Sequence, residues 1–219
     1  MASRSWSSPW RPAAADWGDR GSRTELSEES WYTGQTGYGI AVPNYMQTRT
    51  IADLNSSSAS MIVGIEPGAV LMHRIGENVI PEYGIDLELV EASTPAMLAE
   101  LRRAYVAKEP IVFLAWSPHW MNAEYDFRYL EDPKDAIGPL DEPAELHSVM
   151  RSGLQEDDPV AYALINAMKL GIDEAKVNTL ELSINRAGDP QQGVRDWLEK
   201  EENREAVQSW IEAAKKAEQ

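Results

Sequence analysis

Residues 111–120 read Ile-Val-Phe-Leu-Ala-Trp-Ser-Pro-His-Trp, so an apolar run leads directly into two tryptophans, a proline and a histidine. Pro110 and Pro118 bracket the apolar part, which is too short for an ordinary helix and is typical of a strand buried in an α/β sheet. Ligands of open α/β sheets bind beyond the carboxyl ends of the strands. We therefore expect Trp116, which directly follows the apolar run, to face a ligand.

Further strands and a helix are predicted on the N-terminal side of this run. Residues 38–42 predict a strand or a hinge segment that Pro43 stops, and residues 61–65 and 87–90 predict two short strands. Residues 70–80 carry apolar side chains close to helical spacing, which predicts a helix between those two strands.

A second helix is expected directly before the apolar run. Ser93 or Thr94 can cap it, Pro95 suits its first turn, and it should end near Lys108. The predicted order is therefore β-α-β-α-β with right-handed crossovers, and the fold class is α/β.

The turn at residues 66–69, which contains Gly68, joins a predicted strand to a predicted helix. The first N–H groups of a helix have no partner within the helix and favour a negatively charged group. We therefore expect the N–H groups of Ala69, Val70 and Leu71 to be unpaired and to point into the crevice. An ordinary strand-to-helix turn without a ligand is the alternative.

The rest of the chain is predicted to be mainly helical. Residues 125–130 predict a crossing segment, residues 145–150 a returning strand, and residues 157–159 (Asp-Asp-Pro) the start of a helix. Three more helices are expected on the apolar stripes of Val177, Leu180, Leu182, Ile184, Val194, Trp197, Leu198, Val207, Trp210 and Ile211.

These elements predict three parts of the chain. Residues 1–30 hold Trp6, Trp10 and Trp17 without helical or strand period, and we expect a poorly ordered leader there. Residues 31–150 should form an α/β lobe with hinge and crossing segments, and residues 151–219 a helical part.

Composition limits the possible functions. A net charge of −16 argues against nucleic acid or an anionic membrane as partner, and the absence of cysteine excludes disulfides and thiolate metal sites. Neither a membrane-spanning run nor a secretory signal peptide is seen, so the sequence as written predicts a soluble, unexported chain. His73, His119 and His147 fit no metal or nucleophile motif, so we expect no metal, no cofactor and no enzyme.

Four segments in order, residues 62–69, 96–101, 116–120 and 129–134, resemble the substrate-binding proteins of glycine betaine ABC transporters. The resemblance covers the chain from about Trp31 onward. It implies a type II periplasmic-binding-protein-like fold, whose two lobes close on glycine betaine, proline betaine or choline. It also implies delivery to the membrane permease subunit of an ABC transporter, and a periplasmic or extracellular, membrane-associated location.

The resemblance implies roles for particular residues. Trp116 would form one wall of an aromatic box, since a quaternary ammonium group has no N–H and is held by cation–π attraction of about 2 kcal/mol per desolvated ring. The N–H groups of Val70 and Leu71 would bind the carboxylate, with Gly68 and Ala69 in the same turn.

Three further positions of the resemblance leave alternatives open. His119 would contact the ligand or brace its loop by a hydrogen bond, and Trp120 would be a contact or core packing. Some relatives carry another box tryptophan where this chain has Ala69, so the remaining walls would come from the other lobe.

The resemblance also implies that the N-terminal half of the first lobe is lacking. We expect one complete lobe, about residues 43–126, with hinge segments and the C-terminal helices of an incomplete second lobe. A fragment, a shifted start and a protein that borrows the other half all fit, and binding by this chain should be weak or absent. The alternative function is a degraded paralogue that recruits a partner protein through its C-terminal apolar stripes.

Overall fold

The computed structural model describes residues 24–34, 37–140, 144–170 and 174–218. The chain forms two compact units. The sheet unit comprises Thr36–Glu142, and the helical unit combines Met1–Gln35 with Pro143–Gln219. The boundaries predicted from the sequence lie at residues 30 and 150.

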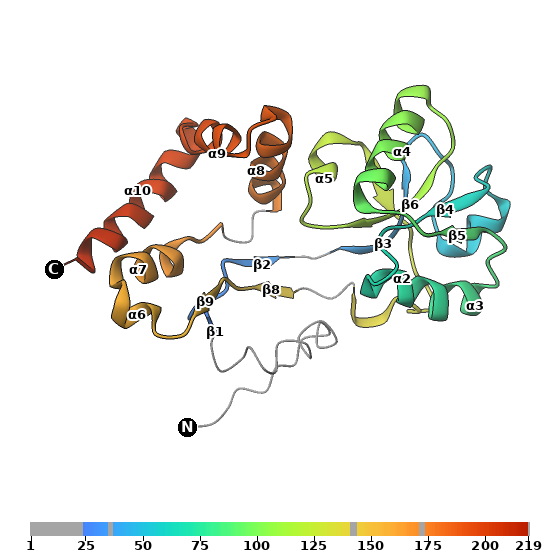
Figure 1. The fold of residues 1–219 in the computed structure, drawn as a ribbon. Helices are drawn as coiled ribbons and strands as arrows, with labels where there is room; N and C mark the ends of the chain where they lie inside the picture. Colours follow the sequence, from blue (N-terminus) through green and yellow to red (C-terminus); the bar gives the residue numbers. More distant parts are fainter. Residues whose placement is uncertain (1–23, 35–36, 141–143, 171–173, 219) are drawn as a thin grey trace, which may run out of the picture. The chain divides into compact units, whose positions relative to one another are not determined.

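The sheet unit is built on a five-stranded sheet with the order β5-β4-β6-β3-β7 (Figure 1). β4 is parallel to both β5 and β6, whereas β3 is antiparallel to both β6 and β7. The strands are β3 (Tyr38–Pro43), β4 (Met61–Val63), β5 (Glu88–Val90), β6 (Val112–Trp116) and β7 (Phe127–Tyr129). The strands predicted in 61–65, 87–90 and the apolar run are confirmed, and 38–42 is a strand of the same sheet.

A strand occupies the crossing segment predicted at residues 125–130. β7 lies there and pairs with β3, with Val42 opposite Arg128. The apolar faces of Phe127 and Tyr129 alternate with Arg128, which is the period of a strand. Phe127 packs edge-on against Phe113 of β6, with ring centroids 5.3 Å apart, so tertiary packing stabilises this short edge strand.

Helices cover both faces of this sheet. α2 (Val70–Arg74), a π-helical segment (Ile75–Val79) and α3 (Ile80–Tyr83) form one continuous helix, which lengthens the helix predicted at 70–80. α4 (Thr94–Ala107) connects β5 to β6. The strand order reverses between these two connections, so right-handed crossovers place them on opposite faces, as Figure 1 shows.

Local capping explains the bounds of α4. The Ser93 hydroxyl accepts a hydrogen bond from the N–H of Ala96 at 3.3 Å, and Pro95 lies in the first turn. Lys108 ends the helix in the left-handed conformation, with φ 56°. The predicted start and end of this helix are therefore confirmed.

The core of the sheet unit lies between the sheet and its helices. Residues 112–115 of β6 are fully buried, as expected for a central strand covered on both faces. Short helical turns occupy Ile51–Ser56, Met121–Glu124 (α5) and Gly138–Leu140. Ile51 and Met121 anchor the first two of these turns in the core, since both are fully buried.

The helical unit contains two antiparallel strand pairs that join distant parts of the sequence. β1 (Thr24–Leu26) pairs with β9 (Val149–Arg151), and β2 (Tyr32–Gly34) pairs with β8 (Ala144–Leu146). β1 corrects the leader prediction for residues 24–26, while Trp6, Trp10 and Trp17 lie outside the described residues. The single returning strand predicted at 145–150 is two strands, each with a partner from the N-terminal segment.

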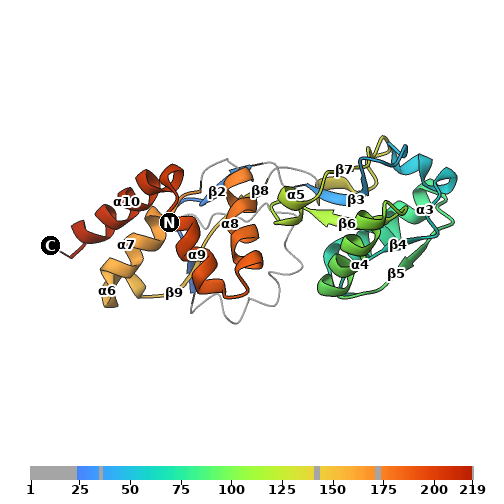
Figure 2. The ribbon, with the colours of Figure 1, turned by 90° about the horizontal axis from the view of Figure 1, so that it is seen from above.

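The helices of this unit confirm the prediction of C-terminal helices. They are α6 (Leu154–Asp157), α7 (Pro159–Ala167), α8 (Glu174–Ala187), α9 (Pro190–Leu198) and α10 (Glu201–Lys216). α8 packs against α9 and α10 packs against α7 (Figure 2). A Cβ on Gly193 of α9 would lie 2.6 Å from Ile184 Cα, so the α8–α9 contact requires glycine there. Trp197 and Trp210 are buried, with 2% and 7% exposure, so they pack in the core.

Candidate functional site

The candidate site lies where the connections of the sheet diverge. β4 and β6 are parallel neighbours, with Ile62 opposite Val112 and Val63 opposite Phe113. After β4 the chain continues to β5, at one edge of the sheet, and after β6 it continues to β7, at the opposite edge. Such a topological switch point opens a crevice at the carboxyl ends of the strands. Trp116 ends β6, and the turn at 66–69 follows β4, so the fold brings both predicted parts of the site to this edge.

Trp116 is half-buried and lies in a row of aromatic rings. The ring of His119 lies 4.7 Å from that of Trp116, and the ring of Trp120 lies 5.4 Å from His119. Tyr125 continues the row at 6.1 Å from Trp120. Trp120 is partly buried and packs against the hydrophobic core, as Trp116 does, so contact and core packing both remain open for it.

A tyrosine that the sequence analysis did not single out lies beside Trp116. Tyr38 is the direct antiparallel partner of Trp116, and directly paired residues of adjacent strands project to the same face of a sheet. Burial raises the pKa of Tyr38 to about 12, so its side chain is uncharged at neutral pH. The sequence shows Tyr38 at the start of a predicted strand, which could have marked it as a candidate site residue. Only the pairing of β3 with β6, however, places Tyr38 next to Trp116.

His119 braces the loop that follows β6. Its Nδ1 accepts a hydrogen bond from the N–H of Met121 at 3.2 Å, so the neutral ring carries its proton on Nε2. Burial lowers the pKa of His119 to about 4. The imidazole is therefore neutral at physiological pH and adds no positive charge beside Trp116. The bracing hydrogen bond offered as an alternative for His119 is present.

Asn122 and Tyr129 also hold this loop, and neither was singled out from the sequence. The Asn122 side chain donates to the carbonyl oxygens of Trp116 at 2.9 Å and His119 at 2.8 Å, and it accepts from the Tyr129 hydroxyl at 3.0 Å. The Ser117–Pro118 peptide bond within the loop is cis. Tyr129 begins one of the four segments quoted above and Asn122 lies two residues beyond another, but their contact appears only in three dimensions.

The amides of the turn after β4 differ from the prediction at one position. The N–H of Ala69 donates to the carbonyl of Glu66 at 2.9 Å, so the prediction of a free Ala69 amide is wrong. The reason is that the turn closes on itself before the helix begins. Within the described part of the chain no acceptor is recorded for the N–H groups of Val70 and Leu71. These are the first two helical positions, whose N–H groups point out of the helix end.

Glu66 ties this turn to the start of α4. Its carboxylate accepts hydrogen bonds from both the N–H and the hydroxyl of Thr94, each at 2.7 Å. These hydrogen bonds lower the pKa of Glu66. The carboxylate therefore stays charged and holds the turn before α2 against the helix on the other face of the sheet.

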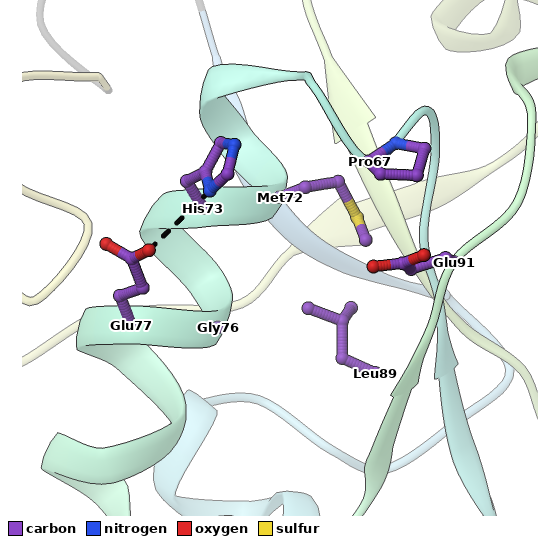
Figure 3. Close-up of a pocket in the computed structure, with 7 residues that line it drawn as sticks. All are labelled: Pro67, Met72, His73, Gly76, Glu77, Leu89 and Glu91. Carbon is purple, nitrogen blue, oxygen red and sulfur yellow. Dashed lines mark ion pairs between the residues drawn. The ribbon is translucent and has the colours of Figure 1, made fainter.

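A small pocket of about 170 Å³ lies beside this turn (Figure 3). It is lined by Pro67, Met72, His73, Gly76, Glu77, Leu89 and Glu91. Figure 3 shows the end of the Met72 side chain pointing from the helix toward Glu91 and Leu89, and His73 Nδ1 pairs with Glu77 Oε1 at 3.6 Å along the helix. Neither this pocket nor a larger one of about 510 Å³ around Tyr45 and Lys108 is lined by Trp116, Val70 or Leu71.

The described residues contain no group of three or more acidic or histidine side chains placed to hold a metal ion. They also contain no helix with the length and apolarity that a membrane crossing requires.

The sequence was compared with protein families and with known proteins. A family model described as the substrate binding domain of ABC-type glycine betaine transport systems matches residues 15–200. The match begins before Trp31 and so reaches into the predicted leader. The glycine betaine/carnitine transport binding protein GbuC of Listeria monocytogenes is 31% identical over 167 residues, which are 75% of this chain and 53% of that protein. The chain thus spans about half the length of this curated relative.

Solved structures of binding proteins share the fold. Lactococcal OpuAC, in a closed conformation complexed with glycine betaine, is similar with a TM-score of 0.70 and 29% identity, over 90% of this chain and 74% of that one. An ABC-transporter choline binding protein in complex with choline is similar with a TM-score of 0.68 and 26% identity, over 95% of this chain and 77% of that one. The fold is that of type II periplasmic binding proteins. Since the family model covers most of the sequence, the chain belongs to the family of substrate-binding domains of ABC-type glycine betaine transport systems.

Proposed function

We propose that this chain binds a quaternary ammonium compound of the glycine betaine and choline type and delivers it to the permease subunit of an ABC importer. The observation that carries the proposal is the position of Trp116 at the carboxyl end of β6, where the sheet has its topological switch point. Family membership supports the ligand class, since the similar structures are described with glycine betaine and with choline.

The cationic end of the ligand would lie against the Trp116 ring. A trimethylammonium group offers no hydrogen-bond donor, so an aromatic face is its natural partner, with about 2 kcal/mol per desolvated ring. The neutral state of His119 favours this arrangement, because a charged imidazole 4.7 Å from the indole would repel the ligand. Tyr38 lies next to Trp116 in the sheet and adds a second uncharged ring at the same edge.

The carboxylate of a betaine would bind at the start of α2. The N–H groups of Val70 and Leu71 are at the amino end of a helix that continues to Tyr83, and such ends favour anions. Gly68 precedes them, and a Cβ there would meet no atom within 4 Å, so the approach to the turn is open. Choline lacks the carboxylate and would use only the aromatic part of this site.

Binding by this chain is proposed to be weak, and its place of action to be outside the cytoplasmic membrane beside the permease. One assigned tryptophan wall and two backbone donors amount to only part of a cage. We therefore expect a dissociation constant of about 1 mM, which corresponds to a binding free energy of about −4 kcal/mol.

Calorimetric or NMR titration with three ligands tests the proposal. The ligands are glycine betaine, choline and 3,3-dimethylbutanoate, which has the shape of glycine betaine but no positive charge. We expect glycine betaine to bind about tenfold or more tighter than 3,3-dimethylbutanoate, because only the cationic group gains from the aromatic faces.

Variants assign the binding to the proposed residue. Trp116→Ala should weaken glycine betaine binding by about tenfold or more, while Trp116→Phe, which keeps an aromatic face, should retain part of the affinity. Equal binding of glycine betaine and 3,3-dimethylbutanoate, or an unchanged affinity in Trp116→Ala, would refute the proposed site. Micromolar binding by this chain would contradict the expected weak affinity.

A further inference from the structure

We propose that Asn122 is a positioning residue that sets the orientation of the Trp116 wall and thereby controls the affinity for the quaternary ammonium group. The inference rests on the proposed function of Trp116, but its argument uses hydrogen bonds that were not part of that proposal. Asn122 itself is not assigned a contact with the ligand.

Asn122 joins three separate segments through one side chain. Its Nδ2 donates to the carbonyl oxygen of Trp116 at the end of β6 and to that of His119 in the following loop, at 2.9 and 2.8 Å. Its Oδ1 accepts from the hydroxyl of Tyr129 on β7 at 3.0 Å. The backbone N–H of Asn122 donates to the same His119 carbonyl at 3.0 Å, so main chain and side chain act on the loop together.

Only a carboxamide satisfies all three contacts. Two carbonyl oxygens require two N–H donors, and a phenolic hydroxyl that donates requires an acceptor. Aspartate has the same shape but would place a negatively charged acceptor against two carbonyl oxygens. Leucine has a similar size and offers neither donor nor acceptor. The neighbouring groups also fix the orientation of the amide, since the reversed orientation would direct its oxygen at the two carbonyls.

The side chain of Asn122 is itself held on rigid parts of the fold. Met121, the preceding residue, is fully buried and anchors α5 in the core. Tyr129 pairs with Ala41 of β3, and a Cβ on Gly37 would lie 3.2 Å from the Tyr129 ring. The ring therefore lies closely against the chain just before β3. The N–H of Ser117 donates to the carbonyl of Gly37 at 2.7 Å, which closes the connection back to the tryptophan loop.

Trp116 depends on these contacts because the sheet ends at this residue. Tyr38 is the last residue that pairs with β6 on the β3 side, and the parallel pairing with β4 reaches only Phe113. Beyond Trp116 the chain direction is set by the loop contacts and not by a strand ladder. Cation–π attraction depends on the position of the cation over the ring face, so a reoriented indole loses affinity without a change in its chemistry.

A double-mutant cycle on glycine betaine binding tests the inference with the full chain. We expect Asn122→Ala to weaken binding about fivefold or more, and to have little further effect in the Trp116→Ala background, since Asn122 acts through the tryptophan. Tyr129→Phe, which removes one of the three contacts, should have a smaller effect of the same kind. Ala123→Ser, on the exposed side of the same helical turn, is the matched control and should bind like the unmodified chain.

A second measurement needs no ligand. Tryptophans with 15N-labelled indole groups give one NMR signal each, and the Trp116 signal is identified by its loss in Trp116→Phe. Asn122→Ala should shift or broaden the Trp116 signal while the methyl signals of the buried Val112 and Leu114 of β6 stay in place, which shows that the sheet unit remains folded.

The outcomes separate the two proposals. If Trp116→Ala does not weaken binding but Asn122→Ala moves the Trp116 signal, the proposed function fails while the positioning contact stands. If Trp116→Ala weakens binding and Asn122→Ala changes neither affinity nor the Trp116 signal, the positioning role is overturned. Effects of the two substitutions that simply add would also overturn it, because they would show that Asn122 acts independently of Trp116.

Discussion

Acidification should destabilise the sheet unit through His119. Burial lowers the pKa of this imidazole from its ordinary 6.5 to about 4. In the unfolded chain the ring binds a proton near pH 6.5, whereas in the folded chain it does so only near pH 4. Between these values the unfolded state holds more protons, so the free energy of unfolding falls as the pH falls from about 6.5 to about 4, and this contribution levels off below that.

The size of the effect follows from the difference between the two pKa values. A pKa lowered from 6.5 to about 4 corresponds to a loss of at most about 3 kcal/mol in the free energy of unfolding on acidification. The ring is only partly buried and solvent screens part of the penalty, so we expect a loss of about 1–2 kcal/mol. Protonation would also place a positive charge 4.7 Å from the Trp116 ring, so binding of a cationic ligand should weaken over the same pH range.

Two assays on the unmodified chain and on His119→Asn measure this effect. An NMR titration of the imidazole signals gives the pKa of His119 directly, and urea unfolding in small pH steps gives the stability. In His119→Asn the amide oxygen can still accept from the N–H of Met121, so the loop keeps its brace but loses the titrating group. Carboxylates with lowered pKa values, such as Glu66, titrate in both proteins, so the stability difference between them isolates His119. A His119 pKa near 6.5, or the same loss of stability in both proteins, would refute the reasoning.

Two further substitutions test the packing that supports the site. Gly64→Ala would place a Cβ 2.7 Å from the carbonyl oxygen of Val90, so it should lower the free energy of unfolding, measured in urea, by about 2–3 kcal/mol. Gly76→Ala is the control, because its Cβ would meet nothing nearer than 3.7 Å and should be neutral or slightly stabilising. Equal effects of the two substitutions would contradict the close approach of β4 to β5. Tyr83→Phe removes a 2.5 Å hydrogen bond to Asp132 and should cost about 1–2 kcal/mol, and an unchanged urea midpoint would show that this contact adds nothing to stability.

Elements with strong local signals were predicted well. The apolar run 111–115 lies in the central strand, and the capped segment after Ser93 is a helix with the expected ends. These predictions succeed because a buried strand needs an unbroken apolar run and a helix start needs a hydrogen-bonding cap, both of which are local properties. β7 was missed because its three residues lie among polar neighbours, and its pairing with β3 and the contact of Phe127 with Phe113 arise only in the folded chain.

The candidate site was predicted in part for the same reason. Trp116 at the end of a strand and the helix start at Val70 and Leu71 could be found from the order of residues alone, because both depend on local secondary structure. The hydrogen bond from the Ala69 N–H to the Glu66 carbonyl could not be predicted from the sequence, since it depends on how tightly the turn closes. The position of Tyr38 next to Trp116 could likewise not be predicted before the pairing of β3 with β6 was known.

By itself, the amino-acid sequence determined the alternation of strands and helices in the sheet unit, the helices at the C-terminus and the family that the motifs indicate. The tertiary structure alone decided the sheet order, the pairing of β1 with β9, and the contacts of Asn122 with Trp116, His119 and Tyr129. The physical reason is the range of the forces involved. Apolar periodicity and helix capping act within a few residues, whereas strand pairing and side-chain hydrogen bonds between segments depend on chain parts that only folding brings together.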